Sequence, residues 1–343
     1  MATNPPTGTA AAPLSAKRNH CMDAVKGLAC IAIVFMHCEF PSRLGTLVQC
    51  LSRFGVPFFF MVSGYFCHSS KGRPDYGRKL RHVLEIALWT TLFYALVTPL
   101  YAPWEGWPDP RALRNWLLFN KPFYIAGQMW FLFALLYDYA LYALFDRKGF
   151  RWVPWAAVPA GIAVYVAMAQ GAHLAGIRIP NMWYRNFLVE GFSLFSLGYL
   201  LRTNAGRIRV SDRLLWTVLA VSTLLCPLER ALLGRDFGVN IATFPQVAAL
   251  FLLCIRNPGL GEGSSLAALG LKYSLLVYVL HPAAWHLLDL LYSAAGVAGN
   301  TAVAYLRPLL CAAVAVCAAA AFTAVRDALT SRSSPTPPKG NRP

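Results

Sequence analysis

The 343-residue sequence is poor in charged residues, and the few that it has are mostly of one sign. Asp, Glu, Lys and Arg make up 13% of the chain, against about 25% in soluble globular proteins. Hydrophobic residues make up 57%, and long apolar runs recur, each close to the roughly 20 residues that cross a bilayer core as a helix. The scarcity of charge excludes an ordinary soluble domain and predicts an all-α membrane protein.

Short motifs for metal or nucleotide chemistry are also missing. The sequence has no HExxH, CxxC, Walker or GxGxxG pattern, so neither a metal site nor a nucleotide-binding loop is predicted. Residues 1–19 lack the apolar core of a cleavable signal peptide. Most of the nine Cys lie within apolar runs, where a free Cys behaves as a small apolar residue.

The apolar runs predict a bundle of about ten transmembrane helices in a single domain, residues 20–328, between disordered tails at 1–19 and 329–343. The ten predicted spans are 22–40, 47–67, 82–101, 123–145, 152–170, 183–201, 214–233, 239–255, 270–292 and 302–325. The seventh and eighth are the weakest, and without this pair eight spans would remain. Segment 102–122 resembles an interfacial amphipathic helix.

The net charge of +16 does not indicate a nucleic-acid partner, because the Lys and Arg residues lie between the predicted spans instead of on one face of a soluble domain. With the N-terminus in the cytoplasm, inside segments hold about twice as many Lys and Arg as outside segments, as the positive-inside rule requires. We therefore expect both termini to be cytoplasmic, in a multi-pass protein whose first partner is the lipid bilayer.

The first predicted span carries three ionisable side chains. At about 100° per residue, Asp23, Lys26, Cys30, Val34 and His37 share one helix face. Lys26 and His37 are almost three turns apart, about 16 Å along the axis. Charged groups within a span usually face a protein interior or a wet cavity, which predicts a polar passage with His37 in its outer part. Alternatively, Asp23 and Lys26 pair near the interface and His37 only marks the outer boundary.

The second span, "RFGVPFFFMVSGYF", holds Arg53 at a depth close to that of His37. Surrounded by aromatic residues, Arg53 needs an anion or a carbonyl partner. Ser63 and Gly64 lie about 15 Å deeper, and Gly64 would let a ligand or another helix approach closely. A small-residue packing contact is the favoured alternative for this pair.

The cytoplasmic loop before the third span contains Arg78 and Arg81, which lie on one face if this segment is helical. Two guanidinium groups at this spacing can clamp a phosphate. An ordinary positive-inside loop, with Arg81 paired to Glu85, is the more frequent situation.

Three further residues are candidates for a site within the spans. Trp130, with Gln128, lies near the outer end of the fourth span, and Glu190 lies in the middle of the sixth. A lone carboxylate at that depth is either partnered or protonated. His281 lies in the ninth span directly before Pro282, which frees a backbone carbonyl. A structural role for His281 is as consistent with the sequence as a functional one.

The ordered set "DAVKGLACIAIVFMH", "RFGVPFFFMVSGYF", "RKLR", "MWFL", "FSLFSLGYLL" and "YSLLVYVLHP" resembles the integral-membrane acyltransferase 3 family. It is most similar to the stand-alone enzymes that O-acetylate surface polysaccharides, and the resemblance extends over residues 18–290. It implies a bundle of about ten helices in a bacterial inner membrane. It also implies transfer of an acetyl group from acetyl-CoA, a co-substrate and not a permanently bound cofactor, to a hydroxyl of an envelope glycan or glycolipid.

The resemblance assigns the family's motifs to particular residues. Its basic residue and His, eleven positions apart, correspond to Lys26 and His37, with Lys in place of the more common Arg. Its Arg-x-x-Arg corresponds to Arg78 and Arg81. Its Ser-Gly-Phe falls on residues 63–65, with Tyr65 in place of Phe.

These assignments lead to a hypothesis for the mechanism. His37, whose ordinary pKa is about 6.5, would act as general base or as a transient acyl carrier. Lys26, Arg78 and Arg81 would contact the donor, and Arg53 would bind an anionic acceptor or the developing oxyanion.

Two other functional classes are compatible with the sequence. A membrane transporter or exporter of an envelope metabolite would use the polar face of the first span as a permeation path. A non-catalytic envelope-assembly protein would tolerate the loss of His37.

Overall fold

The computed structural model describes residues 18–67, 75–102, 109–121 and 127–333, and this part of the chain contains helices and no strand. The α-helices are α1 (His20–His37), α2 (Ser42–Ser52), α3 (Gly55–Tyr65), α4 (Tyr76–Val97), α5 (Pro110–Phe119), α6 (Trp130–Arg147), α7 (Val153–Val166), α8 (Ala172–Leu174), α9 (Phe192–Asn204), α10 (Asp212–Leu233), α11 (Thr243–Arg256), α12 (Ser265–Lys272), α13 (Ser274–Ala294) and α14 (Thr301–Ser333). The prediction of an all-α membrane protein is confirmed.

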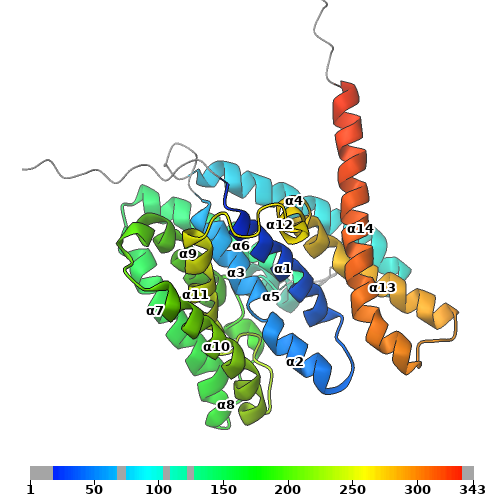
Figure 1. The fold of residues 1–343 in the computed structure, drawn as a ribbon, viewed down its shortest axis with the longest axis horizontal. Coiled ribbons are helices and arrows are strands. Elements are labelled where there is room, and N and C mark those ends of the chain that lie inside the picture. Colours follow the sequence, from blue (N-terminus) through cyan, green and yellow to red (C-terminus); the bar gives the residue numbers. More distant parts are fainter. Residues whose placement is uncertain (1–17, 68–74, 103–108, 122–126, 334–343) are drawn as a thin grey trace, which may run out of the picture.

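Helix α1 lies in the middle of the bundle and packs against α2, α3, α12 and α13. Figure 1 shows α7 and α9–α11 on one side of this centre and α13 and α14 on the other. The bundle therefore surrounds the helix that carries Asp23, Lys26 and His37. We refer to its two ends as the Asp23 end, where α1 begins, and the His37 end, where α1 finishes.

The helices at the edge of the bundle have an apolar face that no other described helix covers. In α4, Val83, Ala87 and Tyr94 are buried at helical spacing, while Trp89 and Leu96 on other faces are 71% and 68% exposed. Large apolar residues exposed on one helix face suit contact with lipid. The same pattern in α10 leaves Leu224 and Leu232 exposed.

Eight helical segments of the described chain are long and apolar enough to span a bilayer, fewer than the ten that were predicted. The two differences fall at the predicted sixth and eighth spans. The sixth is a short π-helical turn, η5 (Phe187–Gly191), continued by α9. The eighth is α11, which has 14 residues. The sequence prediction of a weak seventh span is wrong, because α10 is a full-length helix of 22 residues.

The ends of the predicted domain differ slightly from the structure. Helix α14 continues to Ser333, past residue 329, where a disordered tail was predicted to begin. Residues 1–17 and 334–343 lie outside the described residues. Within the predicted interfacial segment 102–122, the structure has the short helix α5, which begins at Pro110 and has no buried residue.

Close packing of α3 against α9 depends on glycine. A Cβ atom on Gly64 would overlap the carbonyl oxygen of Phe195, and a Cβ atom on Gly198 would overlap the carbonyl of Met61. Each glycine faces the other helix, and the missing side chains let the backbones of α3 and α9 approach closely. Small residues have the same effect in pairs of membrane helices. The packing interpretation of Gly64 is thus the one that the structure supports.

Candidate functional site

A cavity of about 390 Å³ lies at the His37 end of the bundle, within the size range of ligand pockets. Its walls come from the end of α1, the end of α5, the start of α6 and the two short turns η2 (Gly127–Met129) and η4 (Asn181–Trp183). We call it the His37 cavity. It is lined by His37, Phe119, Lys121, Gly127, Gln128, Trp130, Asn181, Met182 and Arg185.

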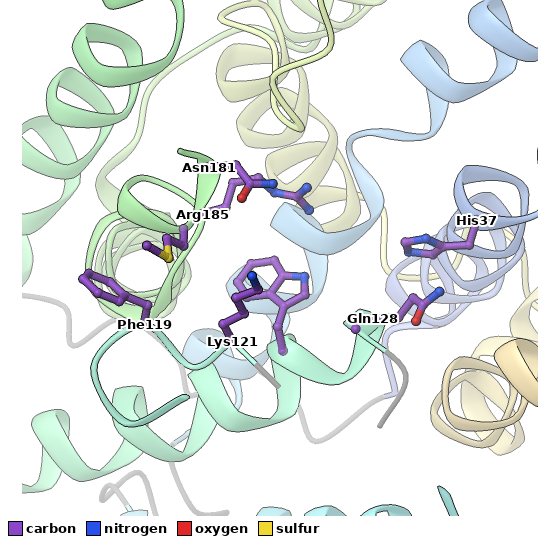
Figure 2. Close-up of a pocket in the computed structure, with 9 residues that line it drawn as sticks. His37, Phe119, Lys121, Gln128, Asn181 and Arg185 are labelled. Carbon is purple, nitrogen blue, oxygen red and sulfur yellow. The ribbon is translucent and has the colours of Figure 1, made fainter. Parts of the chain in front are cut away.

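His37 is the last residue of α1, and its ring extends from the helix end into this cavity. In Figure 2, the His37 ring and the Arg185 guanidinium group point toward one another, and the Gln128 side chain lies beside His37. Behind His37, the ring of His281 is nearly parallel to it, with 5.5 Å between centroids and 25° between planes. His37 is therefore supported on one side and open to a ligand on the other.

His281 is held by the carbonyl group that Pro282 frees. Proline at position 282 has no N–H, so the carbonyl of Tyr278, four residues earlier, loses its normal helical donor. His281 Nδ1 lies 2.7 Å from that oxygen. A carbonyl can only accept, so Nδ1 is the donor and the neutral ring has its lone pair on Nε2. This atom is buried, and no described residue hydrogen-bonds to it.

Arg185 is positioned by Glu190 and Trp130. Its Nε lies 3.8 Å from Glu190 Oε2, and its guanidinium carbon lies 5.5 Å from the centroid of the Trp130 ring. Glu190 is 1% exposed and belongs to the π-helical turn η5, a feature frequent at functional sites. The sequence-based expectation that Glu190 is partnered or protonated is met by this contact. The buried Nε of Arg185 has no hydrogen-bond partner among the described residues.

Asn120 fixes the wall that carries Phe119 and Lys121. It is fully buried and has left-handed backbone conformation, with φ of 47°. Its side chain donates to the carbonyl of Trp130 (3.1 Å) and accepts from the backbone N–H of Phe187 (2.7 Å). This one amide ties the end of α5 to the starts of α6 and η5.

At the other end of α1, the ionisable groups satisfy one another. Lys26 Nζ lies 2.6 Å from one oxygen of Asp23, and Arg18 Nε lies 2.7 Å from the other. The alternative interpretation of Lys26, an ion pair with Asp23, is thus present. Between the two ends, Cys30 and Val34 are fully buried in an apolar cluster with α13 and α14, so the predicted polar passage along this face is wrong.

Arg53 has a carboxylate partner within the protein. It is 9% exposed and forms an ion pair with Asp236, whose carboxylate also lies 3.6 Å from Arg230. Arg53 does not line the His37 cavity. The partner predicted for Arg53, an anion or a carbonyl, is therefore the Asp236 carboxylate, and the cation that faces His37 across the cavity is Arg185.

Ser63 lines a second, mainly apolar cavity of about 160 Å³ between α1, α3, α4, α6 and α13. We call it the Ser63 cavity. Its lining includes His82 and Ser63, and also Phe131 and Tyr278, which lie closer to the His37 end. The Tyr278 hydroxyl donates to the carbonyl of Gln128, a residue of the His37 cavity. Tyr278 therefore stands between the two cavities.

Arg78 and Arg81 lie in the first two turns of α4 at the Asp23 end, and both are exposed. Arg78 Nε lies 2.9 Å from Asp75, the residue that caps the helix. In the described chain, no ion pair joins Arg81 to Glu85. At the same end, a third cavity of about 530 Å³ is lined by Arg151, Arg207 and several aromatic residues.

The sequence analysis missed Arg185, Lys121 and Asn120. Glu190 offered the one available signal, because a buried carboxylate requires a partner and Arg185 is the nearest preceding cation. Lys121 and Asn120 gave no such signal. Among the described residues, no group of three or more His, Cys, Asp or Glu side chains is placed to hold a metal ion.

Comparison with known proteins identifies the family. The acyltransferase 3 model, described as an acyltransferase domain, matches residues 19–322, which include all the helices that line the three cavities. No curated protein and no solved structure matches the chain significantly. Because the match covers far more than half of the sequence, this multi-pass membrane protein belongs to the acyltransferase 3 family and is a membrane acyltransferase.

Proposed function

We propose that the protein is an O-acetyltransferase that moves an acetyl group from cytoplasmic acetyl-CoA to a hydroxyl of a cell-envelope carbohydrate, in a bacterial inner membrane. The observation that carries the proposal is His37, a basic ring that is supported by His281 and open to a cavity opposite Arg185. Both termini and the Asp23 end would face the cytoplasm, as the positive-inside pattern predicts.

The lining of the His37 cavity suits a carbohydrate. Phe119 and Trp130 offer flat apolar faces, and Gln128 and Asn181 offer amide groups. A sugar ring has an apolar C–H face and a rim of hydroxyl groups, so it can use both. Pockets of this kind obtain orientation from a few polar groups on a mainly apolar wall.

The donor would enter from the opposite end. Arg78 and Arg81 are exposed there and would hold the CoA phosphates, as two guanidinium groups at this spacing can. The narrow, mainly apolar Ser63 cavity would take the thin pantetheine arm. Tyr278, between this cavity and the His37 cavity, would lie where the thioester arrives.

The reaction requires one proton to be moved and returned. His37 takes the proton of the acceptor hydroxyl, and the hydroxyl oxygen attacks the thioester carbonyl carbon. The negative charge that develops on the carbonyl oxygen is stabilised by Arg185. The carbon–sulfur bond then breaks, and His37 returns the proton to the CoA thiolate. An acetyl-histidine intermediate at His37 would give the same products in two steps.

Labelled acetyl-CoA and the envelope glycan fraction of the cell of origin, incubated with the purified full-length protein, test this proposal. We expect labelled glycan, and a turnover about 10²–10⁴-fold lower for His37→Ala, as for the loss of a general base. Near-normal turnover of that variant would remove the role of His37. Movement of glycan across the membrane of proteoliposomes that contain the protein, in the absence of acetyl-CoA, would instead indicate a transporter.

The proposed contacts of Arg78 and Arg81 with the donor are tested by a separate pair of variants. If Arg78 and Arg81 hold the CoA phosphates, the double Gln variant raises the KM for acetyl-CoA and leaves the acceptor KM unchanged. The matched control is Arg151→Gln with Arg207→Gln, at the third cavity of the same end. A larger rise of the acetyl-CoA KM in the control would indicate that the CoA phosphates bind at the third cavity instead.

A further inference from the structure

The described residues at the His37 cavity have more positive than negative charge, and the excess positive charge belongs to one residue. Among the described residues that line the cavity, Lys121 and Arg185 are permanent cations and none has a carboxylate. Glu190 lies behind Arg185 and compensates its charge. Within the described part of the chain, Lys121 has no ion-pair partner. Among the described residues, one positive charge at the cavity is therefore uncompensated.

The position of Lys121 is built into the fold. The preceding residue, Asn120, is fully buried and has a backbone conformation that residues other than glycine seldom adopt. Its two side-chain hydrogen bonds join three elements. Figure 2 shows the Lys121 side chain directed into the same cavity as Arg185 and Gln128. Asn120 thus fixes the backbone from which the exposed Lys121 side chain reaches the cavity.

We propose that the acceptor is an acidic glycan, whose carboxylate or phosphate group binds Lys121 while a neighbouring hydroxyl lies at His37. This inference rests on the proposed acetyl transfer. Arg185 remains opposite His37 for the charge that develops during the reaction, and Lys121 binds the charge that the acceptor already has. A compact ammonium group suits a single anionic contact.

Two chemical treatments of the same envelope glycan fraction test the acidic group and its source. Amidation of carboxylates neutralises uronic acids, and cold hydrofluoric acid cleaves phosphoesters. We expect one of the treatments to abolish labelling from acetyl-CoA, and the one that does so identifies the group. Labelling that survives both treatments overturns the inference and leaves the acetyl transfer standing. Absence of labelling on the untreated fraction contradicts the proposed function itself.

Variants of Lys121 test the contact. We expect Lys121→Gln to raise the acceptor KM about 10-fold or more, as for loss of a charge-assisted hydrogen bond, with little change in kcat. Lys121→Arg should restore most of the affinity. Arg178→Gln is the matched control, because it removes one positive charge from a different cavity of the same end. Equal effects of Lys121→Gln and Arg178→Gln, or none from either, would contradict a specific contact.

Discussion

At the beginning of α1, Asp23 accepts ion pairs from Arg18 and Lys26, and all three side chains have partners within the chain. At its end, His37 has a ring neighbour on one side and a cavity on the other. The two ends are almost equally rich in ionisable groups, yet one is closed and the other open. Ionisable residues in a span thus mark a functional site only where the fold leaves them accessible.

The same distinction separates buried Arg53 from half-buried Arg185. Arg53 hydrogen-bonds to the Asp236 carboxylate, while Arg185 lies 3.8 Å from Glu190 without a hydrogen bond from its Nε, and its guanidinium group is directed toward His37. A cation that must respond to charge developing in a reaction cannot already be fully engaged by a carboxylate. The comparison therefore predicts different consequences for these residues and for the two ends of α1.

After His37 itself, the largest effect is expected at Arg185. Arg185→Gln should lower kcat for acetyl transfer about 10²–10³-fold, because it removes a preorganised positive charge from the reacting centre. Arg53→Gln is the control. Its turnover per folded molecule should stay within a few-fold of wild type, because Arg230 still lies beside Asp236. Equal losses of kcat in both variants would show that the closed ion pair also serves the reaction.

An intermediate effect, on stability and not on chemistry, is expected at Asp23. Asp23→Asn leaves Arg18 and Lys26 without their carboxylate, which should cost about 1–3 kcal/mol and lower the melting temperature of the purified protein. Lys26→Met, which removes a single cation and leaves Asp23 paired with Arg18, should cost less. A loss of kcat in Asp23→Asn at unchanged melting temperature would overturn the structural role.

The smallest effect is expected at Pro282. Pro282→Ala supplies an N–H that can bond to the Tyr278 carbonyl and compete with His281 Nδ1. A less firmly held His281 should lower kcat by roughly three- to tenfold, since it acts on the reaction only through His37. Pro227→Ala, within α10, is the matched control and should leave kcat unchanged. An unchanged kcat in Pro282→Ala would show that the hold on His281 does not affect the reaction.

Local patterns were enough to predict the helical architecture and the place of His37 at the end of the first helix. Apolar runs located nearly every helix, and the missing N–H of Pro282 correctly indicated a free carbonyl. The predicted partnering of Glu190 also followed from a local rule, because a buried carboxylate is costly to leave alone. Each of these conclusions depends on residues close together in the chain.

The composition of the cavity could not be predicted in this way. Asn120 meets Phe187 across 67 positions of sequence, and Arg53 meets Asp236 across 183. Helical periodicity gives the face on which a side chain lies but not the segment that covers it. For that reason the sequence selected Arg53 instead of Arg185, and it predicted a polar passage where Cys30 and Val34 pack against α13 and α14.

The central claim is that chemistry occurs at the open end of α1 and not at the closed one. Proteoliposomes with acetyl-CoA on the Asp23 side and glycan on the His37 side test it most directly, with His37→Gln and Lys26→Gln compared to wild type. We predict acetylated glycan with wild type and with Lys26→Gln, and only background with His37→Gln. Near-normal product with His37→Gln, or equal loss with Lys26→Gln, would contradict the claim.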